Sequence, residues 1–151
     1  MGRETACRIE ATRVKLAATI GLGETSMNFL AKWEPQLLSV LRFVAGLLFL
    51  EHGMSKLFHY PHVAMFDHLT PLIMAAGAIE LVGGFLIIIG LFTRIAAFIC
   101  SGEMAIAYWM VHFTRGGPFP VLNGGESAIL FCFVFLFLAA AGPGPWSVDR
   151  K

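Results

Sequence analysis

Charged side chains are scarce in this sequence. Lysine, arginine, aspartate and glutamate make up 14% of its 151 residues, whereas an average soluble domain contains about 25%. The net charge of +1 is small, and the sequence has no basic patch with interleaved aromatic residues, so we expect no nucleic-acid partner. Hydrophobic residues make up 57% of the chain, which is more apolar surface than a water-soluble core of this size can bury. The composition therefore predicts a membrane protein.

Cysteine is also scarce, and the sequence lacks the common catalytic motifs. Its three cysteines, Cys7, Cys100 and Cys132, form no Cys-x-x-Cys pair, so a thiol–disulfide relay within this chain alone is not expected. The Glu-x-x-His spacing of helical di-iron sites is absent. Phosphate-binding loops and nucleophile elbows are absent as well. We therefore expect no metal site and no intrinsic cofactor.

Four long apolar runs dominate the sequence. They cover residues 37–58, 72–92, 95–113 and 126–142, and their lengths are close to the roughly 20 residues of a membrane-spanning helix. Each run is continuously apolar, which excludes the alternating strands of a membrane barrel. The tight connection at residues 90–94 requires the second and third helices to be antiparallel. The sequence thus predicts an all-α fold, an antiparallel bundle of four transmembrane helices.

The distribution of basic residues predicts how these helices are oriented. With the N-terminus in the cytoplasm, most lysines and arginines lie on the inner side, and Lys56 and Arg115 lie on the outer side. We therefore expect both termini in the cytoplasm of a bacterium, with the protein in the inner membrane and Arg94 as an anchor at the inner face. Residues 1–36 are mixed in charge and predict a cytoplasmic or interfacial extension, or a docking segment for a partner. The predicted membrane domain is residues 37–151.

Three acids, Glu51, Glu80 and Glu103, lie deep within the predicted helices. At about 1.5 Å per residue, each acid is within roughly 6 Å of a helix midpoint. A charge at the bilayer centre costs about 2.5–3.5 kcal/mol on insertion scales, so these acids should face other helices or trapped water. Four further polar residues lie between the level of these acids and the outer membrane face, namely His52, Lys56, His112 and Glu126. The predicted polar cluster, a candidate proton or quinone site, comprises Glu51, Glu80, Glu103, His52, Lys56, His112 and Glu126.

Glycines indicate how Glu80 is accommodated. Glycines on its own helix face predict a close helix contact, because small residues mark such contacts in membranes. Glu80 is therefore expected to point toward a neighbouring helix, either as a packing lock with Lys56 or His112 or as a proton or ligand site. Glu51 is turned about 140° away from Lys56, toward another helix or a subunit. The residues expected at helix contacts are Gly46, Gly53, Gly77, Gly83 and Gly84.

Several segments together resemble the DoxX family. They are FLEHGMSKLF in the first helix, IELVGGFLIIIGLFTRIAA across the second and third, His112, GGES at the start of the fourth, and the terminal GPGPWSVD. The resemblance covers residues 37–149. It implies a four-helix integral membrane protein associated with oxidoreductases, including thiosulfate–quinone oxidation and complexes that handle thiol and oxidative stress. Glu51, Glu103 and the N-terminal extension are not carried over by the resemblance, which leaves a specialised role open.

Two main functional hypotheses follow. The first is an accessory membrane subunit of an oxidoreductase complex, with a quinone bound near the polar cluster. The second is a structural anchor or assembly subunit, and a small transporter is a third. A cluster that lines a pocket open to lipid favours the first, whereas a cluster sealed by side-chain pairs favours the second. The expected partners are membrane lipids and a protein of a redox or other membrane complex; self-association and catalysis by the chain itself are left open.

Overall fold

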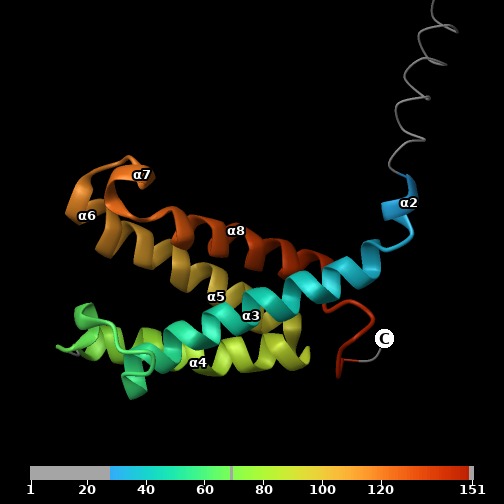
Figure 1. Cartoon of the computed structure of the whole chain (residues 1–151), viewed down its shortest axis with the longest axis horizontal. Helices are drawn as coiled ribbons and strands as arrows, with labels where there is room; N and C mark the ends of the chain where they lie inside the picture. The colour runs from blue at the N-terminus through green and yellow to red at the C-terminus, as the bar shows by residue number, and fades with distance from the viewer. Residues whose placement is uncertain (1–27, 69, 150–151) are drawn as a thin grey trace, which may run out of the picture. The chain divides into compact units, whose positions relative to one another are not determined.

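The computed structural model describes residues 28–68 and 70–149 (Figure 1). Residues 1–27, most of the predicted N-terminal extension, lie outside the described residues. Contacts divide the chain into two units, with the boundary between Pro35 and Gln36. The short helix α2, Asn28–Ala31, belongs to the first unit. The second unit contains the predicted membrane domain, and the site described below lies within it.

Helices and turns account for the described residues, and no strand occurs among them. The long elements of this part are α3 (Glu34–Phe58), α4 (Pro71–Ile89), α5 (Thr93–Ala107) and α8 (Glu126–Ala141). α5 continues through the π-helical turn η2 (Tyr108–His112) into α6 (Phe113–Gly116). The short helices η1 (Ala64–Phe66) and α7 (Pro120–Asn123) lie in the two longer connections. The predicted all-helical fold is confirmed.

Three segments of the described chain are long and apolar enough to cross a membrane. They are Glu34–Phe58, Pro71–Ile89 and Thr93–Gly116. Helix α8 is also apolar but has only 16 residues, or about 24 Å at 1.5 Å per residue, against a hydrocarbon core of about 30 Å. Val82, Leu130 and Phe133 are exposed on the outside of these helices, where such side chains contact lipid. A fourth span at α8 stays a prediction.

Local chemistry sets the boundaries of α4 and α5. The Thr70 hydroxyl accepts a hydrogen bond from the Ile73 N–H at 3.3 Å, and Pro71 occupies the first turn. Gly90 ends α4 with φ of 69°, a left-handed conformation that glycine adopts without steric cost. Helix α5 then begins at Thr93 and runs back along the bundle (Figure 1). The predicted second helix was therefore too long at its C-terminal end, because Gly90 stops it before residue 92.

Helices α3 and α4 pack closely through glycines. A Cβ atom at Gly53 would lie 2.5 Å from the Leu81 backbone nitrogen. A Cβ atom at Gly84 would lie 2.7 Å from the Leu50 backbone nitrogen. Helix α5 packs on α8, where the Ser101 hydroxyl donates to the Cys132 carbonyl at 2.8 Å. Figure 1 shows the resulting two pairs, α3 beside α4 and α5 beside α8.

The segment after α8 folds back over the turn between α4 and α5. The buried Arg42 of α3 donates to the carbonyl of Pro143 in this segment at 2.8 Å, and it also donates to the Trp146 carbonyl. At the segment's end, the Asp149 carboxylate accepts the backbone N–H groups of Thr93 and Phe92, each at 3.0 Å. These hydrogen bonds from Thr93 and Phe92 hold the pKa of Asp149 below its usual range. The segment therefore caps the start of α5.

Arg94 lies at the same end of the bundle. Its guanidinium donates to the carbonyls of Ala139 and Ala140 at 2.9 and 2.5 Å. These carbonyls belong to the last turn of α8, which has no intrahelical donors for them. The sequence predicted Arg94 as an inner-face anchor, and the structure gives it a direct structural contact with the end of α8. Its position relative to a membrane face stays a prediction.

Candidate functional site

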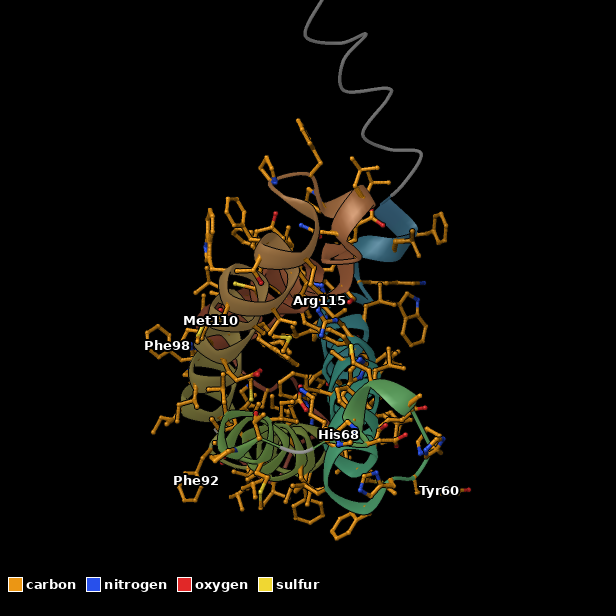
Figure 2. All side chains as sticks on the ribbon, turned by 90° about the vertical axis from the view of Figure 1, so that its left-hand side faces the viewer. Tyr60, His68, Phe92, Phe98, Met110 and Arg115 are labelled. Carbon is orange, nitrogen blue, oxygen red and sulfur yellow. The ribbon has the colours of Figure 1, made fainter. Side chains whose placement is uncertain are left out.

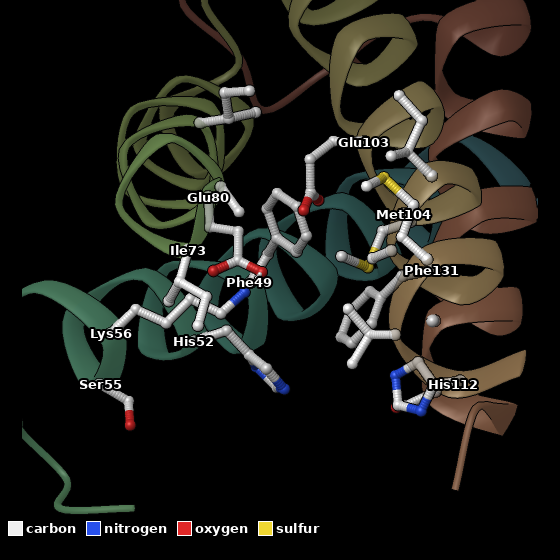
Figure 3. Close-up of a pocket in the computed structure, with 18 of the residues that line it drawn as sticks. Phe49, His52, Ser55, Lys56, Ile73, Glu80, Glu103, Met104, His112 and Phe131 are labelled. Carbon is white, nitrogen blue, oxygen red and sulfur yellow. Dashed lines mark hydrogen bonds and ion pairs between the residues drawn. The ribbon is translucent and has the colours of Figure 1, made fainter. Parts of the chain in front are cut away.

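A cavity of about 870 Å³ lies among α3, η1, α4, α5, η2 and α8 (Figure 3). Most of its lining is apolar, with Phe49 and Phe131 on the inside. Ile99 and Ile106 of α5 also line it, and these side chains are 51% and 56% exposed. The cavity is therefore continuous with a surface that contacts lipid. A lipid-soluble molecule could enter it from the bilayer.

The end of the bundle near the 59–70 connection is the viewpoint of Figure 2. Phe98 and Met110, which line the outer part of the cavity, point away from the bundle there. Arg115, another lining residue, reaches across from α6 and donates to the Met65 sulfur at 2.9 Å. Sequence reasoning gave Arg115 no role beyond its place on the outer side. The cavity thus combines an apolar side opening with polar groups near this end.

Glu80 is fully buried in α4 and forms an ion pair with Lys56 of α3. The Lys56 Nζ atom lies 2.5 Å from Glu80 Oε1. The Lys56 ammonium also lies 5.5 Å from the centroid of the Phe66 ring, a favourable cation–π position. Gly77 allows this approach, because a Cβ atom there would lie 3.0 Å from the Lys56 Cβ. Of the two partners predicted for Glu80, the structure selects Lys56 and not His112.

A second acid, Glu103 of α5, enters the same cavity. Figure 3 shows the carboxylates of Glu80 and Glu103 directed into the space that also holds the Lys56 ammonium. One oxygen of each carboxylate, Oε2, is buried and has no hydrogen-bond partner in the described part of the chain. Buried polar atoms normally find such partners. Lys56 thus pairs with Glu80, and each of the two acids keeps one buried oxygen without a hydrogen-bond partner in the described part of the chain.

Two histidines, His52 and His112, line the cavity together with these acids. The Nδ1 atom of His52 lies 2.8 Å from the Leu48 carbonyl oxygen, and that of His112 lies 3.2 Å from the Asn123 carbonyl oxygen. A carbonyl oxygen only accepts, so each Nδ1 donates. In the neutral imidazole, Nε2 is then an acceptor.

The π-helical turn η2 brings His112 to the cavity. His112 follows Glu103 by nine residues, and at about 100° per residue an ideal α-helix would place the two on opposite faces. A π turn holds more residues per turn and so rotates the following side chains back. Tyr108 and His112 then lie with stacked rings, 6.5 Å between centroids. Periodicity gave no signal of this turn.

The remaining members of the predicted cluster are placed differently. Glu51 lines the cavity but is largely exposed to the outside. Glu126, at the first position of α8, is exposed and does not line the cavity. No group of three metal-ligating side chains occurs among residues 28–68 and 70–149. The cavity therefore holds six of the seven predicted cluster residues.

Gly102 is a cavity residue that sequence reasoning missed. It lies on α5 between Ser101 and Glu103, and a Cβ atom there would meet no atom within 4 Å. Unlike the glycines predicted at helix contacts, Gly102 does not face a neighbouring helix at close range. An isolated glycine in a helix costs stability relative to alanine, and this was the available signal that space is kept open here.

Long apolar helices with exposed apolar side chains define this chain as an integral membrane protein. A family model for DoxX matches residues 37–113, and the chain belongs to the DoxX family. An uncharacterized protein of Haemophilus influenzae (strain KW20/Rd) is 42% identical over 133 residues, which cover 83% of this chain and 97% of that protein. No solved structure matches the chain.

Proposed function

We propose that this DoxX protein is a membrane subunit of an oxidoreductase complex and that it binds a quinone in the cavity. The observation that carries the proposal is an apolar cavity, continuous with the lipid-facing surface, that acids and histidines from several helices line together. A quinone has an apolar tail for such an opening and a ring whose oxygens exchange protons with acids and bases. The electron donor in this proposal is a partner protein.

The proposal includes a location and a topology. The protein lies in the inner membrane of a bacterium with four spans and both termini in the cytoplasm. The excess of lysine and arginine in the segments assigned to the cytoplasm supports this orientation. The cavity and its polar groups then lie toward the outer face. A ring bound there is close to proteins of the outer compartment.

A structural subunit is the second candidate function. It is favoured by the close pair between Lys56 and Glu80 and by the tie that Arg42 makes between α3 and the C-terminal segment. Such contacts hold helices together without any ligand. In this alternative the cavity is filled by lipid chains, and the polar cluster serves only to fix the arrangement of α3 and α4.

The test uses the full chain, purified in a mild detergent, with extraction of bound quinone and identification of co-purifying proteins by mass spectrometry. Gly102→Leu fills the cavity, since the new side chain meets open space. Ala78→Leu adds a similar volume to an exposed position of α4 that does not line the cavity. We expect stoichiometric quinone in the wild type and in Ala78→Leu, and its loss in Gly102→Leu.

Other outcomes separate the two candidates. A stable protein partner without quinone in the wild type supports the structural subunit. Equal amounts of quinone in all three proteins contradict binding in the cavity, because Gly102→Leu would then leave the site untouched. Thermal unfolding of both variants shows whether each one is folded before the quinone content is compared.

A further inference from the structure

Two carboxylate oxygens in the cavity are left without a hydrogen-bond partner in the described part of the chain. Glu80 is 0% exposed, yet its Oε2 atom has no hydrogen-bond partner in the described part of the chain. Glu103 Oε2 is also buried and has no hydrogen-bond partner in that part of the chain. An ionised carboxylate accepts hydrogen bonds and donates none. Two acceptors are therefore aimed into one space with nothing to satisfy them (Figure 3).

Each of the main side-chain donors around the cavity makes one hydrogen bond within the protein. Lys56 donates to Glu80 Oε1 at 2.5 Å, and the Ser55 hydroxyl donates to the Pro61 carbonyl at 2.8 Å. Arg115 is directed to the Met65 sulfur.

The two histidines add acceptors to this inventory. His52 and His112 use Nδ1–H for the carbonyl oxygens of Leu48 and Asn123. Each neutral imidazole then offers Nε2 as an acceptor. The lining of the cavity thus offers acceptor atoms from two acids and two histidines.

We propose that the cavity binds the reduced, dihydroxy form of the ring in preference to the dione. This inference rests on the proposed function and adds the redox state of the ligand. A hydroquinone brings two O–H donors, which can satisfy Glu80 Oε2 and Glu103 Oε2. A dione brings acceptors alone and leaves both carboxylate oxygens unpaired. Sites built around a ligand hydroxyl discriminate strongly against analogues without one.

The test measures binding to the full-length protein in lipid nanodiscs under anaerobic, reducing conditions. The probes are a short-chain hydroquinone, its dimethyl ether and, without reductant, the corresponding quinone. We expect the hydroquinone to bind at least about tenfold more tightly than either other probe, the factor typical of a hydrogen bond to a charged acceptor. The binding should disappear in Gly102→Leu, which separates the cavity from partition into lipid.

Glu103→Gln tests the acceptor role directly. The substitution keeps the shape of the side chain and replaces one acceptor oxygen by an NH₂ donor. We expect the preference for the hydroquinone to fall about tenfold. Glu126→Gln makes the same chemical change outside the cavity, and it should leave the preference unchanged.

The remaining outcomes are distinct. Equal or tighter binding of the quinone overturns the inference about redox state and leaves the proposed function standing. Absence of binding for both ring forms overturns the proposed function as well. An alkylammonium ion of similar size that outcompetes the hydroquinone overturns the assignment of the cavity to a ring diol, because it would show that the acids select positive charge.

Discussion

At the scale of single residues, Glu80 shows how a carboxylate is held among apolar helices. It is completely buried, and the Lys56 ammonium at 2.5 Å supplies its counter-charge. The mutual attraction offsets the cost of removing both charges from water only when the geometry is close. Gly77 makes that geometry available, because it lets the Lys56 stem lie against α4. The position thus depends on one glycine and one basic partner.

Glu80→Gln is expected to destabilise the protein by about 3 kcal/mol, since removal of one partner leaves the other buried and uncompensated. The measurement is the free energy of unfolding in mixed micelles titrated with SDS. Glu126→Gln is the matched control, because Glu126 is exposed and lies outside the cavity. Its unfolding free energy should equal that of the wild type. Equal stability of the two variants would contradict the role assigned to the Lys56–Glu80 pair.

At the scale of elements, the α3–α4 contact depends on the absence of side chains. The Gly53 face lies against the backbone of Leu81, and the Gly84 face lies against that of Leu50. Backbones approach this closely only where one of the two facing residues lacks a Cβ atom. The contact fixes the register of the two helices and thereby sets which residue of α3 reaches Glu80.

Gly53→Ala should therefore destabilise the protein by about 1–3 kcal/mol, because the added methyl would lie against backbone atoms that cannot rotate away. Gly102→Ala provides the comparison on another helix. A Cβ atom at Gly102 meets nothing within 4 Å, and alanine is the better helix former, so a gain of up to about 1 kcal/mol is expected. Both values come from the same unfolding titration. A similar effect of the two substitutions would argue against a close contact at Gly53.

The cap on α5 predicts a pH dependence. Backbone N–H groups of Thr93 and Phe92 favour the ionised Asp149 and lower its pKa. The resulting stability is present above the unfolded-state pKa of about 3.9 and is lost as the pH falls through the lower folded-state pKa. The difference in melting temperature between wild type and Asp149→Asn should therefore be constant from pH 7 to about 5 and shrink below about 4. A difference that does not change with pH would contradict this cap.

At the scale of the whole molecule, the cavity arises because two helix pairs enclose a space near one end of the bundle (Figures 1 and 3). The polar residues of three helices meet there, and apolar side chains of α5 lead from it to the surface. Which membrane face this end approaches determines where a bound ligand exchanges protons. The predicted topology places it at the outer face.

Labelling with a membrane-impermeant maleimide on intact cells tests this topology. His68 and Val121 occupy exposed positions of the two connections near the cavity. The cysteines of His68→Cys and Val121→Cys should react with the maleimide on intact cells, whereas the native Cys7 should react only after the cells are opened. Cys100→Ala and Cys132→Ala remove the background. Reaction of Cys7 in intact cells would contradict the predicted orientation.

The sequence by itself determined the class of protein, the apolar helices and the glycines of their contacts. Hydropathy and helical periodicity are local properties, and continuous runs such as 72–92 express them directly. It also restricted the partner of Glu80 to Lys56 or His112. The sequence did not predict that the left-handed Gly90 ends α4 before residue 92. It also grouped Glu126 with the cavity acids, although Glu126 does not line the cavity.

Only the tertiary structure decided how the polar residues meet. The choice of Lys56 for Glu80 depends on the distance between two helix backbones, which glycines on both helices set together. The placement of His112 depends on the π turn at Tyr108–His112, which changes the angle that an ideal helix would give. The open space beside Gly102 depends on all the surrounding helices. These are relations between distant parts of the chain, and no local pattern contains them.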